Sequence, residues 1–471
     1  MIFNSLQFAE FFLIFYLIYL FSNHKWQNRF LLIASCIFYG AWNWKFLFLL
    51  FTTTIIDYNV AIKMSETEHT KKRKFLLTIS ILSNLGILGF FKYCNFFASN
   101  LHHLAALLGF SLNVHVLNII LPVGISFYTF QAMSYTIDVY RKQVLPSRNF
   151  FEFALFITFF PQLEAGPIER AAHMLPQFRS DRKLRMDWIL EGAYLILWGL
   201  FQKMFIADNL TKLVTPVFNS APPYNGIEVL LAVYVFAIQI FCDFAGYSNI
   251  ARGLARLMGF DLMVNFNLPY FATNPSEFWQ RWHISLSRWL KDYLYIPLGG
   301  NRKGNLITLR NLMITMILGG LWHGAAWTFV FWGFYHGLLL VLYRVIGPFV
   351  PQPKNEILQK VFFILKIVFF FHLVCLGWLF FRAETMTQVF HMLRALVLNF
   401  HFVPQVSHML KNLLTFSFIL LMVQIYEYVR KDFFAPFKWK PLPQICFYLM
   451  IFYCILFLGV TSSEQFIYFQ F

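Results

Sequence analysis

The chain carries little charge. Only 13% of its 471 residues are Asp, Glu, Lys or Arg, whereas a soluble globular protein carries roughly 25%. Hydrophobic residues make up 59% of the sequence, and phenylalanine alone occurs 61 times. A soluble chain of this size would need more polar surface to cover its core, so the scarcity of charge argues against a water-soluble enzyme. We expect the excess apolar surface to face lipid.

Patterned cysteines and the common hydrolase motifs are also missing. The six cysteines are scattered, without a Cys-x-x-Cys pair or a Cys/His metal spacing, so neither a disulfide framework nor a zinc site is supported. No Gly-x-Ser-x-Gly elbow and no His-Glu-x-x-His motif occurs, and serine-hydrolase and zinc-protease readings therefore find no support. We expect no bound metal.

The sequence also shows no sign of a cleavable leader and no obvious internal repeat. The N-terminus has no basic region and no small-residue cleavage site after the apolar residues 6–21, so we interpret this run as a retained first span. Without an obvious internal repeat, the inverted-repeat plan of many transporters is disfavoured.

What charge there is lies between apolar runs. Lys and Arg outnumber Asp and Glu by 38 to 22, which gives a formal charge of +16. A basic soluble protein would suggest a nucleic-acid partner, but short basic loops between apolar runs are typical of cytoplasmic loops in membrane proteins. Spans need about 20 mainly apolar residues. Candidate spans begin near residues 7, 28, 45, 75, 116, 188, 227, 311, 330, 361, 412 and 442.

These runs predict an all-α, polytopic membrane protein with about 11–12 spans, forming a single domain over residues 1–471. An even number of spans puts both termini on the extracytoplasmic side, in agreement with the basic loops. The apolar segment 150–160 lies between two basic loops and is too short to cross twice. We expect it to dip into the membrane and return, with Pro161 and Gly166-Pro167 in the turn, and to form a wall of a functional cavity.

An aromatic helix is predicted after residue 273. Asn274 is a candidate N-cap, Pro275 suits the first helical position, and Glu277 stands where a capping-box acid would. Apolar and aromatic residues then follow helical spacing through Tyr293, with His283 among them. Such a helix is either an anchor at the membrane surface, with a satisfied histidine, or the element that points His283 into a buried site. The turn-rich basic loop at 295–303 is either a simple loop or an anion-binding site.

A second histidine lies within an apolar run. Residues 311–330 are long enough to span and contain one ionisable side chain, His323, beside the small residues Gly320 and Gly324. Ionisable groups at this depth usually face a bundle interior or a cavity. His323 is either a packing histidine or a general base, since neutral imidazole suits proton abstraction from a hydroxyl near pH 7.

Several stretches around these histidines together make the sequence resemble the membrane-bound O-acyltransferase family, and within it the branch of alginate O-acetyltransferase membrane subunits. The resemblance covers nearly the whole chain, and its most specific part is the block 241–337. The matching stretches are Phe160-Pro161-Gln162, Ala165–Ile168, Phe241–Phe244, Gly246–Ser248, Phe278–Trp289, Asp292–Arg302, Gly319–Gly324 and Tyr468–Phe471.

The resemblance implies a ring of helices and interfacial segments around a central tunnel, with His323 and His283 as the catalytic histidines. The expected tunnel lining is Trp322, Trp282, Asp243, Asn274, Gly320 and Gly324. The resemblance further implies an acetyl donor such as acetyl-CoA, with no resident cofactor. It places the chain in the bacterial inner membrane, next to an exported or periplasmic acetyltransferase partner and an envelope polysaccharide such as alginate.

Two rival functions stay open from the sequence. The same chemistry on another acceptor would be peptidoglycan O-acetylation or D-alanyl transfer to an envelope polymer. A rival of a different class is a membrane transporter or scaffold without catalysis. Release of acetyl groups from acetyl-CoA by the purified protein would separate an enzyme from a carrier.

Overall fold

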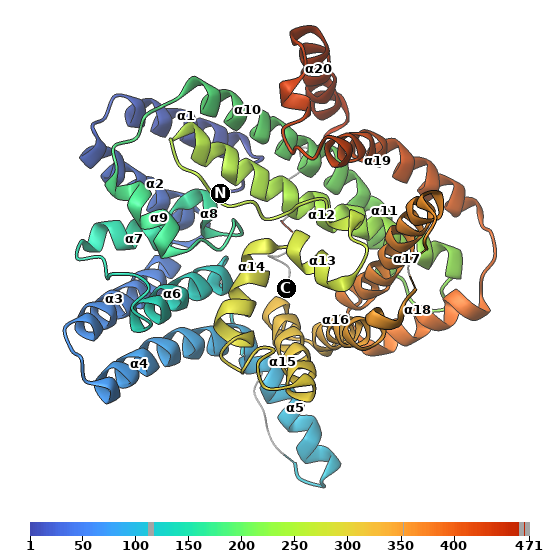
Figure 1. Ribbon diagram of the computed structural model, residues 1–471, viewed down its shortest axis with the longest axis horizontal. Helices are drawn as coiled ribbons and strands as arrows, with labels where there is room; N and C mark the ends of the chain where they lie inside the picture. The colour runs from blue at the N-terminus through green and yellow to red at the C-terminus, as the bar shows by residue number, and fades with distance from the viewer. Residues whose placement is uncertain (112–116, 352, 461–465, 467–471) are drawn as a thin grey trace. The chain divides into compact units, whose positions relative to one another are not determined.

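The computed structural model describes residues 1–111, 117–351, 353–460 and 466. Every regular element in these residues is a helix, which confirms the all-α prediction (Figure 1). The family-like end Tyr468–Phe471 lies outside the described residues.

Nine helical stretches in the described part of the chain are long and apolar enough to cross a membrane. They are α3 (Lys45–Ser65), α4 with α5 (Thr70–Leu107), α10 with α11 (Met186–Phe218), α12 (Gly226–Leu257), α15 (Asn305–His323), α16 (Trp327–Ile346, continuing to Phe349), α17 (Glu356–Arg382), α19 (Pro404–Arg430) and α20 (Pro441–Leu458).

Three of the twelve expected spans are not among these nine. The first is α1 (Leu6–Leu20), which has only 15 residues, and the second is α2 (His24–Asn43), which starts with a polar turn. The span expected near residue 116 begins partly on residues that are not described, and the helix there, α6 (Ile125–Tyr140), starts only at Ile125. Gly124 precedes it at φ +73, where a Cβ would lie 2.5 Å from a backbone oxygen, so the apolar run is broken before it can form one long helix.

The described chain forms two compact units. Unit 1 comprises residues 1–190 and 254–263, and unit 2 comprises residues 191–253 and 264–471. Both catalytic candidates, His283 and His323, belong to unit 2. The expectation of one domain over the whole chain stays a prediction.

A buried carboxylate organises the packing of α3, α4 and α6 in unit 1. Asp57 is fully buried and accepts hydrogen bonds from Ser80 Oγ at 2.5 Å and from Asn84 Nδ2 at 2.8 Å. Ser80 Oγ also lies 2.9 Å from Thr136 Oγ1 on α6. A polar group in such a place is tolerated because it is hydrogen-bonded, so this network fixes how the three helices meet.

The segment expected to dip is almost wholly buried in unit 1. Helix α7 (Phe150–Thr158) ends at Phe159, whose ψ of 107° interrupts the helix, and a short helix α8 (Phe160–Leu163) follows. The N–H of Phe160 at this break donates to Ser35 Oγ on α2 at 3.1 Å. Pro161 lies inside α8 rather than in the turn, which corrects that part of the prediction. The dip into a membrane stays a prediction.

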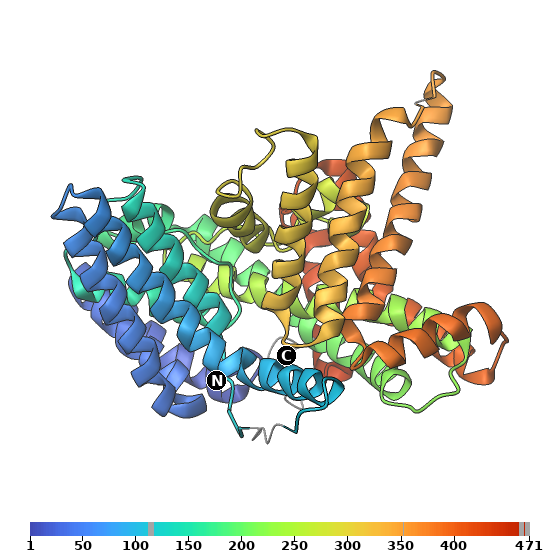
Figure 2. The same ribbon diagram turned by 90° about the horizontal axis from the view of Figure 1, so that it is seen from below.

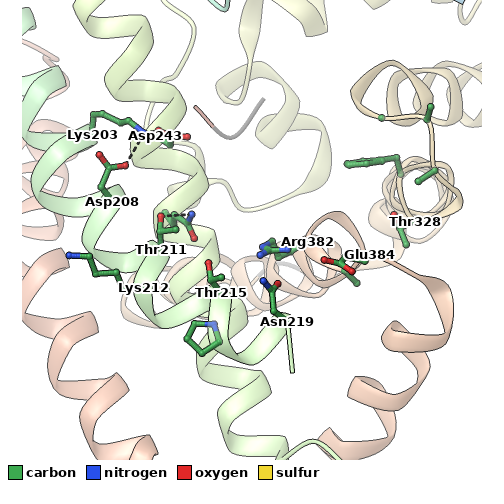
Figure 3. A pocket seen from close by; sticks show the side chains of 17 residues that line it. Lys203, Asp208, Thr211, Lys212, Thr215, Asn219, Asp243, Thr328, Arg382 and Glu384 are labelled. Atoms are coloured by element: carbon green, nitrogen blue, oxygen red, sulfur yellow. Dashed lines mark hydrogen bonds and ion pairs between the residues drawn. The ribbon is translucent and has the colours of Figure 1, made fainter. Parts of the chain in front are cut away.

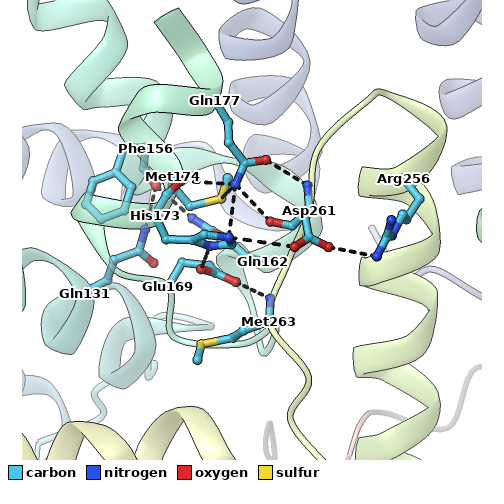
Figure 4. Close-up of polar contacts among 10 residues, drawn as sticks. All are labelled: Gln131, Phe156, Gln162, Glu169, His173, Met174, Gln177, Arg256, Asp261 and Met263. Carbon is cyan, nitrogen blue, oxygen red and sulfur yellow. Dashed lines mark hydrogen bonds and ion pairs between the residues drawn. The ribbon is translucent and has the colours of Figure 1, made fainter. Parts of the chain in front are cut away.

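The loop 258–263 is attached to helix α9 (Ala171–Arg179) by side chains of that helix and the residues before it (Figure 4). Gln177 bonds both the N–H and the C=O of Asp261, at 2.8 and 3.1 Å. Glu169 accepts from the Met263 N–H at 2.6 Å and from His173 Nδ1 at 2.8 Å. The Glu169 carboxylate raises the pKa of His173 above its ordinary value, against the opposing effect of partial burial.

Glycines set the closest helix contacts of unit 2. Gly192 and Gly199 on α10 face Gly253 and Gly246 on α12. A Cβ on Gly199, Gly246 or Gly253 would lie 2.6–2.8 Å from a backbone oxygen of the other helix. The seven-residue spacing on both helices keeps these glycines on one face. Small residues let membrane helices approach closely, and here they hold α12 against α10.

Candidate active site

The helix that starts at Asn274 forms as predicted but ends earlier. Asn274 Oδ1 accepts from the Glu277 N–H at 2.9 Å, and Pro275 is the first residue of α13 (Pro275–Arg281). The expectation of one helix through Tyr293 is wrong, because Trp282 is extended and a new helix, α14 (Ile284–Leu290), follows.

His283 occupies the break in a left-handed conformation, with φ of +42°. This region costs an L-residue roughly 1–2 kcal/mol, and such strain persists where surrounding structure fixes it, often at functional sites. The segment 265–267 does so here: the Ile284 N–H donates to Asn265 O at 2.9 Å, and the Asn267 N–H donates to Arg281 O at 2.8 Å. The break aims His283 inward instead of leaving it on the face of an interfacial helix.

Asn265 also determines the proton position on His283. Its Oδ1 accepts from the backbone N–H of Ser285 at 3.2 Å and from Ser285 Oγ at 3.0 Å, and it lies 3.2 Å from His283 Nδ1. A backbone N–H can only donate, so the atom that it contacts is the amide oxygen. His283 Nδ1 therefore carries the hydrogen, and Nε2 carries the lone pair. All three residues are about 1% exposed, and desolvation lowers the pKa of His283 to about 3.

His323 lies opposite His283, with 6.4 Å between the ring centroids. It is the last residue of α15, and Gly324 follows in an extended conformation. The expected continuous span over 311–330 is therefore wrong: the run contains the end of α15, a three-residue turn and the start of α16. The helices run side by side (Figure 2) because Gly320 and Gly333 lack side chains; a Cβ on Gly320 would lie 2.2 Å from Phe329 O.

Aromatic rings enclose both imidazoles. His283 lies 4.7 Å from Phe244 and 5.9 Å from Trp322, measured between ring centroids. His323 lies 4.9 Å from Trp332 and 5.4 Å from Phe381 and is only 3% exposed. The two imidazoles are thus buried in an aromatic cluster, where charge interactions are stronger than in water.

A polar cavity of about 980 Å³ reaches the residue next to His323 (Figure 3). The cavity wall contains a buried ion cluster. Lys203 Nζ lies 2.8 Å from both Asp208 Oδ1 and Asp243 Oδ1. The full lining is Lys203, Asp208, Thr211, Lys212, Thr215, Pro216, Asn219, Gln239, Asp243, Gly324, Ala325, Ala326, Thr328, Phe329, Arg382, Ala383 and Glu384. Eleven of these seventeen residues carry a hydroxyl, amide or charged group.

A second cavity, here named the basic cleft, measures about 800 Å³ and reaches the residue next to His283. Its lining is Ser276, Trp279, Gln280, Ile284, Ser287, Arg288, Leu290, Lys291, Tyr295, Leu312, Thr315, Met316, Leu340, Tyr343 and Arg344. It meets α15 at residues 312–316, whereas the polar cavity meets the chain at Gly324, just after α15 ends. The basic cleft thus reaches the middle of α15 and the polar cavity reaches its C-terminal end, and the eight helical residues between Met316 and Gly324 span about 12 Å.

Comparison with known proteins identifies the architecture around this pair. Residues 41–383 match the membrane-bound O-acyltransferase family model. The chain belongs to the membrane-bound O-acyltransferase family. It is an O-acyltransferase. It is 42% identical over 390 residues to the probable alginate O-acetylase AlgI of Pseudomonas putida, covering 82% of this chain and 78% of the relative.

Two further relatives span similar lengths. The probable alginate O-acetylase AlgI of Pseudomonas aeruginosa is 40% identical over 400 residues, which cover 84% of this chain and 75% of the relative. The peptidoglycan O-acetyltransferase of Helicobacter pylori is 35% identical over 402 residues, which cover 80% of this chain and 75% of the relative.

The structure of this acyltransferase separates the predicted site residues into three groups. Asp243 and Gly324 line the polar cavity. Trp282 and Trp322 belong to the aromatic cluster, with Trp322 5.0 Å from His323 between ring centroids. Asn274 is the N-cap of α13 and Gly320 a packing glycine. Their roles toward substrate, like those of the two histidines, stay predictions.

The sequence reasoning missed Asn265, Lys203 and Asp208. A lysine inside the apolar run 194–207 was a usable signal, because a cation at bilayer depth usually has a fixed partner and a function. Asn265 gave no such signal, since an asparagine in a polar loop is unremarkable until its partner is known. In the described residues there is no cluster of three or more His, Cys, Asp or Glu side chains placed to hold a metal ion.

Proposed function

We propose that this enzyme transfers an acetyl group from a thioester donor to a hydroxyl of a cell-envelope polysaccharide, with alginate as the favoured acceptor. The observation that carries the proposal is the buried histidine pair, with the polar cavity reaching the residue after His323 and the basic cleft reaching the residue after His283. The identity of 40–42% to alginate O-acetylases supports alginate as the acceptor.

In the proposed reaction His323 is the general base. It takes the proton of the acceptor hydroxyl as the oxygen attacks the thioester carbonyl; the C–S bond then breaks, and the imidazolium returns the proton to the leaving thiolate. General base catalysis contributes roughly a hundred- to ten-thousand-fold. His283, held neutral by burial and aligned by Asn265, relays the proton by accepting it on the lone pair of its Nε2.

Access to His323 from the polar cavity requires aromatic side chains to move. Phe329 lines that cavity and lies 4.9 Å from Phe381, which in turn lies 5.4 Å from His323, between ring centroids. Phe329 therefore lies at the wall of the cavity, and Phe381 lies between it and the base. A wall of this kind keeps water from the thioester until the acceptor enters, which suppresses hydrolysis.

We further propose the sidedness of the reaction. The basic cleft lies toward the end of α15 that follows Arg302 and Lys303, and basic loops favour the cytoplasm. The donor, acetyl-CoA in our proposal, would enter from that side of the bacterial inner membrane. The polar cavity would then open to the extracytoplasmic side, where an exported acetyltransferase partner presents the polysaccharide hydroxyl.

The test replaces the histidines one at a time. His323→Ala should reduce acetyl transfer at least a hundredfold, because the base is lost, while the amount of protein in the membrane stays the same. His336→Ala is the matched control: its ring is equally buried, on the neighbouring helix α16, against Phe278 and Trp279. Wild-type acetylation in His323→Ala would remove His323 from the mechanism.

A second acceptor has specific support. The peptidoglycan O-acetyltransferase relative is 35% identical over a similar share of this chain, and the hydroxyl- and amide-rich polar cavity suits either glycan. Assaying the purified enzyme with alginate and with peptidoglycan fragments distinguishes the two acceptors. D-alanyl transfer predicts instead that acetyl-CoA is not consumed, and a non-catalytic transporter predicts no acetyl release with any acceptor.

A further inference from the structure

The aromatic cluster of unit 2 contains indole N–H groups that have nothing to donate to. In the described part of the chain the side-chain nitrogens of Trp279, Trp332 and Trp378 are buried without a hydrogen-bond partner. Leaving a buried donor unpaired costs free energy. Such a group in a folded protein therefore needs an explanation, and a catalytic role is one of the few that apply.

Trp332 differs from the other two tryptophans because its ring contacts the proposed base. It is 1% exposed, and its ring centroid lies 4.9 Å from that of His323, with the two rings nearly perpendicular at 83°. The next residue, Gly333, touches α15 so closely that a Cβ would lie 2.3 Å from Met316 O. This contact between α15 and α16 fixes the indole beside His323.

The groups around Trp332 do not satisfy its N–H. The ring of His336 is the nearest, 4.8 Å away between centroids, but neither of its nitrogens has a hydrogen-bond partner either. Trp279, Trp378 and Phe381 lie 5.7, 6.1 and 5.4 Å away and offer only the faces of their rings, which are weak acceptors. The N–H is therefore available to a stronger acceptor that enters the site.

We propose that the Trp332 N–H binds the oxygen of the acyl carbonyl and stabilises the negative charge that develops there. This inference rests on the proposed function, which brings the acyl group beside His323. As the acceptor oxygen attacks the carbonyl carbon, the π electron pair of the C=O bond moves onto the carbonyl oxygen. When the C–S bond breaks, that pair returns and forms the carbonyl of the product ester. The indole keeps its proton throughout, so His323 stays the base.

The setting of Trp332 suits this role. A donor already held in place, with no partner to give up, needs no reorganisation when charge appears on the oxygen, and its effect is larger in buried surroundings than in water. An oxyanion is a stronger acceptor than a carbonyl, so the hydrogen bond strengthens in the transition state. Its loss should therefore lower kcat and leave KM nearly unchanged.

The experiment removes the N–H and keeps an aromatic ring. Trp332→Phe should lower kcat for acetyl transfer from acetyl-CoA by about a hundredfold, the usual loss for one donor of this kind, with a KM near that of the wild type. Trp378→Phe is the matched control. The Trp378 N–H is also buried and unpaired, but its ring packs against Trp282 and Trp332 at 4.9 and 6.1 Å, and its kcat should stay near wild type.

A second variant preserves the shape of the indole, because phenylalanine is smaller and leaves space in the cluster. Benzothienylalanine introduced at position 332 carries sulfur in place of the N–H. We expect the same loss of kcat together with a melting temperature at or above that of the wild type, since a buried unpaired donor has been removed. A wild-type kcat overturns the proposal. An equal loss of kcat from benzothienylalanine at position 378 also overturns it, because packing would then be the cause.

Fluoroacetyl-CoA supplies a measurement that a purely structural role would not change. Fluorine withdraws electrons and stabilises the oxyanion by itself, so the kcat defect of Trp332→Phe should be several-fold smaller with this donor than with acetyl-CoA. Equal defects with both donors contradict the proposal.

His323→Ala, measured in parallel, separates this inference from the proposed function. Wild-type transfer in His323→Ala would remove the base and, with it, the proposed mechanism. If His323→Ala is inactive while Trp332→Phe has wild-type kcat, only the assignment of Trp332 fails.

Discussion

Removal of the Asn265 side chain tests the alignment of His283 more sharply than removal of the histidine itself. Asn265→Ala deletes the oxygen that accepts from His283 Nδ1 and from the N–H and Oγ of Ser285. A typical hydrogen bond contributes about 0.5–1.5 kcal/mol net. If that energy selects the imidazole tautomer with its lone pair on Nε2, its loss lowers kcat roughly two- to tenfold. KM should change little, because Asn265 is buried.

Asn265→Asp separates alignment from simple structural support. A carboxylate keeps the acceptor for Nδ1–H but adds a negative charge beside the imidazole, which raises a pKa by roughly 1–3 units at this distance. The pKa of His283, about 3 in the wild type because of desolvation, would then reach about 4–6. We therefore expect a wild-type rate above pH 7 and a new loss of activity as the pH falls through that range.

The assay is acetyl transfer by the purified enzyme from pH 4.5 to 9, with kcat and KM separated at each pH. Asn249→Ala is the control, because this nearby asparagine donates to Gln202 at 2.9 Å. It should keep the wild-type profile. If Asn265→Asp has the wild-type pH profile and Asn265→Ala only loses stability, then Asn265 is a structural residue and His283 does not act in its neutral, aligned form.

Three further changes test the packing. Gly246→Ala places a Cβ 2.8 Å from a backbone oxygen of α10 and should lower the free energy of unfolding by about 1–3 kcal/mol through overpacking. Thermal unfolding in detergent measures this loss. Gly86→Ala is the control, and its melting temperature should change little because there is open space around Gly86. Lys203→Met leaves two buried carboxylates without their cation and should destabilise the protein by about 3–5 kcal/mol, whereas Lys212→Met, at the exposed side of the same cavity, should not; equal melting temperatures for the two variants would contradict the buried ion cluster. Glu169 raises the pKa of His173 in the folded state. The stability that protonated His173 contributes is therefore complete below pH ~6.5 and is lost as the pH rises through the raised pKa. Over that range the melting temperature of the wild type should fall more than that of His173→Gln, and parallel curves would contradict the assignment.

The helical architecture and the catalytic candidates followed from local features of the sequence. Apolar runs of span length predicted nearly all of the long helices, and an Asn-Pro-x-Glu pattern predicted the start of α13 to the residue. Isolated histidines in apolar surroundings identified His283 and His323, because an ionisable side chain is costly there and must be compensated. The structure brings these two rings together within unit 2, which the sequence could suggest only through the family resemblance.

The sequence pattern did not predict the two helix breaks that shape the site, one at His283 and one after His323. Periodicity continued through His283, and hydropathy continued from 311 to 330, so each region was predicted as one helix. A left-handed histidine becomes tolerable only when the distant segment 265–267 bonds the backbone on both sides of it. The turn after His323 requires a glycine at 324, because the Phe329 ring occupies the place that a Cβ on Gly324 would take.

The sequence by itself determined that the chain is a helical membrane protein and where most of its helices lie. It also determined which histidines stand in apolar surroundings, where an ionisable side chain needs a catalytic role or close packing to compensate its cost. Those properties depend on the hydrophobicity and spacing of neighbouring residues, which can be read along the chain. Only the tertiary structure decided that His283 and His323 face each other, that Asn265 fixes the proton of one of them, and that a cavity reaches each end of the pair. Those features depend on contacts between residues far apart in sequence. Such contacts form, and stabilise the structure, only when the helices pack together.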